Sequence, residues 1–99
     1  MNQIESHIAG SKPVIVDFSA DWSVPCTLMG PVMHEVNNKV GGRATIFHVD
    51  IDKNPTFAER YAVLTVPTLI IFKDGMPLWR KSGVVPAHEI LENLDMHID

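Results

Sequence analysis

The sequence has a single cysteine, Cys26, in 99 residues. A single cysteine cannot form a disulfide within the chain, which excludes the disulfide-stabilised folds of small secreted proteins. Basic residues are also in the minority, since 8 Lys and Arg stand against 12 Asp and Glu for a net charge of −4. This balance argues against a nucleic-acid partner, because nucleic-acid binding normally needs a basic surface.

Long apolar runs are missing as well. No stretch is long and apolar enough to span a membrane, so we expect no membrane partner. Residues 1–5 lack the basic segment and apolar run that open a signal peptide, and the sequence therefore predicts a cytoplasmic protein. The five histidines are scattered, with no pair at helical i, i+4 spacing, and no glycine-rich phosphate loop is present. We accordingly expect no metal site and no cofactor.

The residues that are present are those of one globular domain. Hydrophobic residues make up 45% of the chain and charged residues 20%, which is an ordinary balance for a folded protein. No repeat, low-complexity tract or linker divides the chain, so we expect a single domain over residues 1–99.

Apolar patterning predicts strands that alternate with helices. Short apolar runs bounded by turn residues predict strands at residues 14–18, 45–49, 68–72 and 78–82. Helical spacing predicts helices at residues 4–8, from about 24 to 40, and after Asn54-Pro55. A closing helix is predicted by apolar residues that share one face, namely Ala87, Ile90, Leu91, Leu94 and Ile98.

This order of elements predicts an α/β fold. Strands that alternate with helices favour parallel pairing through right-handed crossovers. The last two strands flank the turn Lys73-Asp74-Gly75-Met76 and should form an antiparallel hairpin at the sheet edge. We therefore expect a mixed four-stranded sheet with helices on both faces.

The segment Trp22-Ser23-Val24-Pro25-Cys26 resembles the redox motif of the thioredoxin family, and the resemblance extends over nearly the whole chain. The other matching segments are Val16-Asp17-Phe18, Pro31, Val49-Asp50-Ile51-Asp52, Val66-Pro67-Thr68, Lys73-Asp74-Gly75 and Gly83. The resemblance implies a thioredoxin-like fold without the family's N-terminal strand. It also implies a thiol–disulfide oxidoreductase lineage, with disulfide-containing proteins as partners and a thioredoxin-reductase-like protein as reductant.

Ser23 is the one departure from the family's Trp-Cys-x-Pro-Cys motif, because it stands where the family has the attacking cysteine. Disulfide reduction needs a thiolate at this position, where the helix N-terminus stabilises the anion, and a serine hydroxyl cannot form a disulfide. We therefore expect the chain to be inactive as a dithiol reductase. As a structural residue, Ser23 is expected to cap the helix, its side-chain oxygen accepting from the N–H of Cys26.

Cys26 and Asp17 complete the implied reaction centre. Cys26 matches the resolving cysteine and should lie in the first helical turn, beneath Ser23. Asp17 interrupts a buried apolar strand, where a carboxylate is costly without a partner. The resemblance implies that Asp17 handles the proton of Cys26. A lysine that lies near this acid in the family is matched by His48, which we expect to pair with Asp17.

The resemblance also implies a substrate-binding surface. Pro67 matches the family's cis-proline, which would leave the backbone N–H and C=O of Val66 to pair with an extended substrate strand. The other residues implied for this surface are Trp22, Pro25, Gly83 and Val84.

Two other functions fit the same residues. One is a natural, redox-inactive binding module that holds a partner on the Trp22, Val66-Pro67 and Gly83-Val84 surface. The other is a monothiol enzyme that uses Cys26 alone, which burial of the sulfur disfavours. A buried thiol would not link two chains, so we expect a monomer. Ser23 is either natural or engineered, and the retained Asp17 slightly favours an engineered serine.

Overall fold

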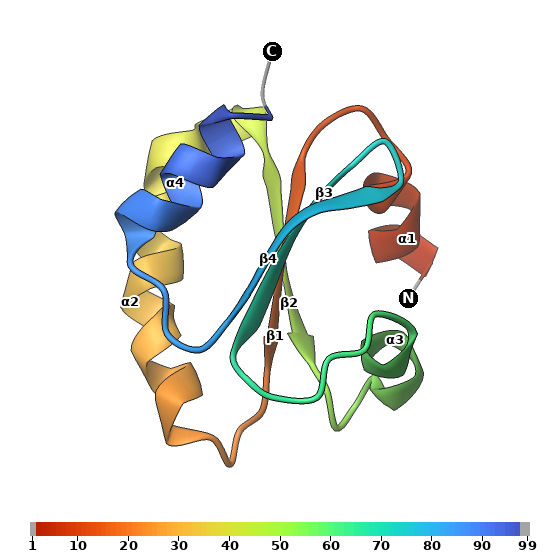
Figure 1. Cartoon of the computed structure of the whole chain (residues 1–99), viewed down its shortest axis with the longest axis vertical. Helices are drawn as coiled ribbons and strands as arrows, with labels where there is room; N and C mark the ends of the chain where they lie inside the picture. Colours follow the sequence, from red (N-terminus) through yellow and green to blue (C-terminus); the bar gives the residue numbers. More distant parts are fainter. Residues whose placement is uncertain (1, 98–99) are drawn as a thin grey trace.

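A four-stranded β-sheet separates two layers of helices (Figure 1). The computed structural model describes residues 2–97, so Ile98 lies outside the described residues. In chain order the elements are α1 (Asn2–Ile8), β1 (Val14–Ser19), α2 (Val24–Val40), the 3₁₀ turn η1 (Gly41–Arg43), β2 (Thr45–Asp50), α3 (Pro55–Arg60), β3 (Thr68–Lys73), β4 (Met76–Ser82) and α4 (Ala87–Asp95). Helices α2 and α4 cover one face of the sheet, and α1 and α3 cover the other (Figure 1). The α/β class and the mixed sheet are confirmed.

The strand order is β2-β1-β3-β4, and one strand direction differs from our prediction. β1 and β2 are parallel, whereas β3 is antiparallel to both β1 and β4. The expectation of parallel pairing across each helix was therefore right for β2 and wrong for β3. The reason is the length of α3, whose six residues rise only about 9 Å while a six-residue strand spans about 20 Å. This helix cannot carry the chain back along the sheet, so β3 begins at the end where β2 finishes.

The central strands β1 and β3 are buried on both faces, as their continuous apolar runs predict. Towards α2 and α4, the core contains Ile15, Leu69 and Ile71 packed against helical residues that include Met33 and Ile90. On the opposite face, the core combines aliphatic and aromatic side chains. It contains Phe18, Phe57 and Phe72, and the ring centroids of Phe18 and Phe57 lie 5.7 Å apart.

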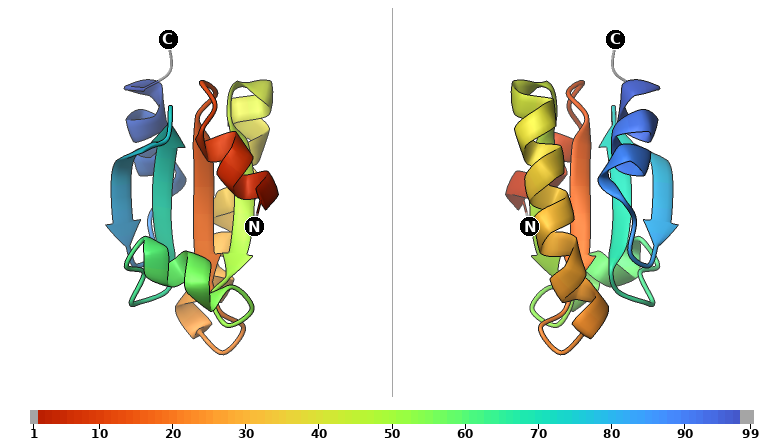
Figure 2. Two further views of the ribbon diagram at one scale, coloured as in Figure 1. Left: turned by 90° about the vertical axis from the view of Figure 1, so that its right-hand side faces the viewer. Right: turned by 90° about the vertical axis from the view of Figure 1, so that its left-hand side faces the viewer.

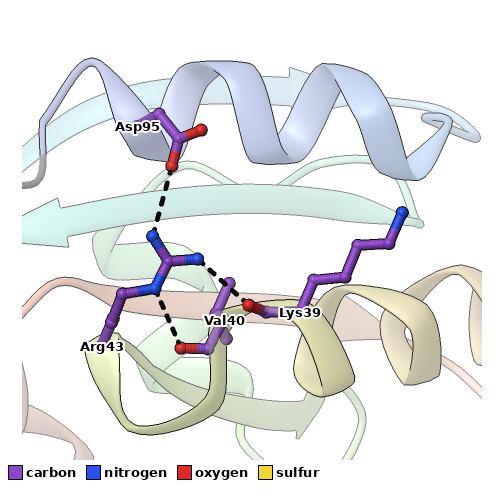
Figure 3. A network of polar contacts seen from close by, with 4 residues as sticks. All are labelled: Lys39, Val40, Arg43 and Asp95. Atoms are coloured by element: carbon purple, nitrogen blue, oxygen red, sulfur yellow. Dashed lines mark hydrogen bonds and ion pairs between the residues drawn. The ribbon is translucent and has the colours of Figure 1, made fainter.

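Arg43 links the C-terminal ends of α2 and α4, which lie on the same face of the sheet (Figure 3). Its Nε donates to the carbonyl of Val40 at 3.2 Å and its Nη2 to the carbonyl of Lys39 at 3.0 Å. Its Nη1 lies 3.7 Å from the carboxylate of Asp95 in α4. The guanidinium thus satisfies carbonyls that the end of α2 would leave without intrahelical donors. In the part of the chain that the structure describes, no helix is long and apolar enough to cross a membrane.

Candidate active site

Four connecting segments meet at one end of the sheet. β1, β2 and β4 finish at this end and β3 begins there, because β1, β2 and β4 run in one direction and β3 in the other. The segments are residues 20–23 before α2, 51–54 before α3, 61–67 before β3 and 83–86 after β4. The topology therefore brings the motif around Ser23 to the same end as the predicted substrate-binding residues.

Ser23 is the N-cap residue of α2, with extended backbone angles, and is only 5% exposed. The predicted capping bond is absent, since the side chain makes no capping hydrogen bond. The backbone carbonyl of Ser23 accepts from the N–H of Cys26 instead, at 3.2 Å. Pro25 has no N–H to offer at the other usual capping position. Our placement of the cap was therefore right, and the predicted role of the hydroxyl was wrong.

Cys26 lies three residues after Ser23, in the first turn of α2. Residues at this spacing lie on the same side of a helix, with about 5–6 Å between their Cβ atoms. A thiol at position 23 would accordingly lie about one helical turn from the thiol of Cys26. Cys26 is a free cysteine and is partly buried, so its sulfur is less enclosed than the sequence predicts.

Asp17 and His48 form a hydrogen-bonded pair in the site. Asp17 is 5% exposed, and His48 is its directly opposed neighbour on the parallel strand β2. The Nδ1–H of His48 donates to Oδ2 of Asp17 at 3.0 Å, as expected from the sequence. This hydrogen bond raises the pKa of His48 above 6.5, and the charge of Asp17 acts in the same direction against the opposing effect of partial burial. Oδ1 of Asp17 is buried and accepts no hydrogen bond from residues 2–97, so this oxygen can still take a proton or accept a bond.

Trp22 precedes the cap residue and is 69% exposed. Its Nε1–H donates to Oδ2 of Asp52 at 2.8 Å, which holds the indole against the segment between β2 and α3. Asp50 shapes that segment, because its Oδ1 accepts from the backbone N–H of Asp52 at 2.8 Å. Asp52 had no predicted role. The signal was the pair of acids that directly follows a predicted strand.

The other side of the site is formed by the ends of β3 and β4. The Val66–Pro67 peptide bond is cis, as the resemblance implied. Pro67 is buried and Val66 is partly buried, and the N–H of Gly83 donates to the carbonyl of Pro67 at 2.8 Å. Gly83 has a φ of +94°, a backbone conformation that favours glycine. Val84, the next residue, is exposed.

Arg80 holds the segment between α3 and β3 by hydrogen bonds. The sequence did not predict this role. From β4, its guanidinium donates to the backbone carbonyls of Tyr61 and Ala62, the latter at 2.7 Å. Ala62 has a φ of +54°, which is uncommon for a residue with a side chain. The two bonds fix the direction in which the chain approaches Val66.

An apolar rim surrounds the site. Among the large hydrophobic side chains left exposed, five belong to the segments at this end and to the first turns of α2, namely Trp22, Val24, Leu28, Leu64 and Val84. Exposed apolar side chains gathered in one region are typical of a protein-binding surface. Pro25 is exposed within the same region. Among the described residues, no group of three His, Cys, Asp or Glu side chains is placed to hold a metal ion.

A family model described as thioredoxin matches residues 2–96. The chain belongs to the thioredoxin family. The thioredoxin of Staphylococcus epidermidis is 42% identical over 84 residues, which cover 85% of this chain and 81% of that protein. The thioredoxin of Staphylococcus aureus matches with the same identity and coverage.

Solved structures agree with this assignment. A mutant thioredoxin from Halobacterium salinarum superimposes with a TM-score of 0.89 at 25% identity, covering all of this chain and 86% of that one. The thioredoxin of Malassezia sympodialis gives a TM-score of 0.87 at 26% identity, with coverage of 97% and 84%. The family supports a thiol–disulfide oxidoreductase lineage, and its members generally act on disulfide substrates together with a reductase.

Proposed function

We propose that this thioredoxin-family protein interacts with disulfide-containing proteins but does not reduce them catalytically, because Ser23 occupies the position of the attacking thiol. The observation that carries the proposal is the first turn of α2. Ser23 lies at the helix N-terminus, and Cys26, the one cysteine of the chain, lies on the same turn. The site thus has a residue to resolve a mixed disulfide and lacks the residue that forms it.

The chemistry of disulfide reduction explains this division. A thiolate attacks one sulfur of the substrate disulfide, and the other substrate sulfur leaves and takes up a proton. The second thiolate then attacks the mixed disulfide, which releases the remaining substrate thiol and leaves the protein oxidised. An external dithiol returns the protein to its reduced form. A serine hydroxyl supports neither the first bond nor the exchange that follows it.

The neighbouring residues fit the roles that the family implies. Asp17 supplies a buried carboxylate with one oxygen open, and His48 connects its other oxygen to the exposed surface. Trp22, Val66 and Val84 supply the surface for an extended segment of the partner protein. All of these residues come from one chain, so the proposal needs no second copy.

Turnover of insulin with a small dithiol as reductant tests the proposal. The parent chain should show no turnover above the dithiol alone, and Ser23→Cys should turn insulin over. A Ser11→Cys variant is the matched control, because Ser11 is exposed at the opposite end of the sheet and its thiol cannot pair with Cys26. Turnover by the parent chain, or equal turnover by the two cysteine variants, would overturn the assigned roles.

A second candidate function is a binding module without redox turnover. The observation that favours it is the apolar rim, in which Trp22 is 69% and Leu64 is 89% exposed. This candidate gains if Ser23→Cys also fails to turn over insulin while retaining the fold. In that case, unfolded reduced insulin chains should still bind the parent protein, and Trp22→Ala should weaken that binding.

A further inference from the structure

The two outer strands of the sheet, β2 and β4, differ in how they are protected (Figure 2). Natural proteins block open sheet edges with proline, with charged side chains and with irregular pairing. β4 has all three devices, since it contains Pro77, Arg80 and Lys81 and its pairing with β3 shifts register. The sequence of β2 contains no proline, lysine or arginine, and its register with β1 is continuous over six residue pairs. β2 is therefore an edge that can accept another strand.

The hydrogen bonds between β1 and β2 show which residues of β2 direct their backbone groups outward. Thr45 donates its N–H to Pro13 beside β1, and Ile51 donates its N–H to Ser19 in the same way. Because backbone groups alternate in direction along a strand, those of Ile46 and His48 point away from β1. Within the described chain, no strand pairs with this outer side of β2. Two residues thus offer N–H and C=O groups to an incoming strand.

The side chains of the same two residues line a pocket. It has a volume of about 380 Å³ and lies between α2 and β2, and we call it the β2 pocket. Its lining residues are Gly30, Met33, His34, Asn37, Ile46 and His48. A strand that pairs with Ile46 and His48 would present a side chain on the same face of the sheet, over this pocket.

The charges of the β2 pocket indicate which side chain fits. Its lining holds two histidines and no acidic residue. Nδ1 of His48 is bound to Asp17, so Nε2 is directed to the far side of the ring, and it donates a hydrogen bond whenever the ring is protonated. Asp50 lies on the same face of β2 as His48, but its Oδ1 accepts a hydrogen bond from the backbone N–H of Asp52. The carboxylate of Asp17 already offsets part of the positive charge of protonated His48, but it contacts Nδ1 and not Nε2. A carboxylate in the pocket thus gains a charge-assisted donor while His48 is protonated.

We propose that the β2 edge docks an extended peptide segment, which adds as a strand beside β2 and places an Asp or Glu side chain in the β2 pocket. A second copy of the chain fits this edge less well. α1 lies over the first half of β2, where the ring centroids of His7 and Phe47 lie 5.2 Å apart (Figure 2).

The test uses the full chain and a blocked heptapeptide, acetyl-Thr-Val-Thr-Glu-Thr-Val-Thr-amide. Titration followed by NMR at pH 6 should shift the backbone amides of Ile46 and His48. A peptide with Lys in place of the central Glu should bind about tenfold more weakly, because it loses a charge-assisted hydrogen bond and meets a protonated histidine. A peptide N-methylated at alternate residues should not bind, because it cannot pair with the strand.

Variants of the protein separate the pocket from the edge. The double variant His34→Gln, His48→Gln should bind the Glu and Lys peptides equally, and His88→Gln, an exposed histidine on α4, should keep the preference. Ile46→Lys should abolish binding of both peptides, with circular dichroism confirming the fold. Shifts confined to Trp22 and Val84, equal binding of the Glu and Lys peptides by the parent chain, or a dimer in sedimentation that excludes the peptide would overturn the proposal. None of these outcomes depends on Ser23, so failure here leaves the proposed function untouched.

Discussion

Asp17 and His48 are opposed across two parallel strands, one side chain buried and the other exposed, and a single 3.0 Å hydrogen bond joins them. The pair links the interior of the site to the surface of the molecule. It also makes the stability of the fold depend on pH, because the hydrogen bond and charge of Asp17 raise the pKa of His48.

His48→Gln should lower stability more at acidic pH than at alkaline pH. A histidine whose pKa is higher in the folded than in the unfolded protein adds stability that is complete below pH 6.5, and this stability is lost as pH rises through the folded pKa. Because His48 is exposed, we expect a loss of no more than about 1 kcal/mol at pH 5.5, and a smaller loss at pH 9. Urea unfolding at both pH values measures the difference. His88→Gln is the control, and an equal loss for His48→Gln at the two pH values would contradict the prediction.

Asp17→Asn should change stability differently at alkaline and at acidic pH. At pH 9 the histidine is neutral, and the buried carboxylate keeps one oxygen without a partner, which is costly. The variant should then be at least as stable as the parent. At pH 5.5 it should be less stable relative to the parent, because protonated His48 has lost its anion. Melting temperatures at each pH check this, and a clear decrease at pH 9 would show that the carboxylate stabilises the fold.

Cys26 should react with an aromatic disulfide reagent more slowly in the native chain than in denaturant. The residue is partly buried in the first turn of α2, so the reagent reaches its sulfur from a limited range of directions. We expect the native rate to be lower by roughly an order of magnitude, with complete labelling of one thiol in both states. Stopped-flow absorbance gives both rates. Equal rates would mean that the sulfur is open to solvent.

Asp52→Ala should release the indole of Trp22 with little effect on stability. The hydrogen bond between them lies at the surface, so we expect a change in unfolding free energy within about 0.5 kcal/mol. The fluorescence anisotropy of Trp22 should fall, measured in a Trp79→Phe background. Asp21→Ala removes a neighbouring exposed carboxylate and should leave the anisotropy unchanged.

The sequence predicted the buried elements well, because burial leaves a local pattern. β1 and β3 are continuous apolar runs, and Asp17 stood out as the polar exception within one of them. The direction of β3 left no such pattern. It follows from the length of α3, which periodicity alone leaves uncertain by a residue or two at each end.

The polar contacts of the site were predicted less completely. The pairing of His48 with Asp17 followed from the family's strand positions, whereas the bond from Trp22 to Asp52 joins two loop segments whose positions no strand register fixes. The hydroxyl of Ser23 was predicted to cap α2 by a rule that assumes the first N–H groups are available. Pro25 removes one of these donors, which the sequence already shows. The carbonyl of Ser23 engages another, the N–H of Cys26, and this competition is visible only in three dimensions.

The end of the sheet opposite the site is suited to the attachment of a label or a surface. It holds the segment 10–13, the turn η1 and the turn between β3 and β4, where the N–H of Asp74 donates to Gly10 and that of Gly75 to Ile8. A strand length of roughly 20 Å separates these loops from Ser23. A fluorophore or a surface anchor attached there would therefore leave the apolar rim facing solution. Immobilised in this orientation, the protein would present every copy of its site to a partner in the same way.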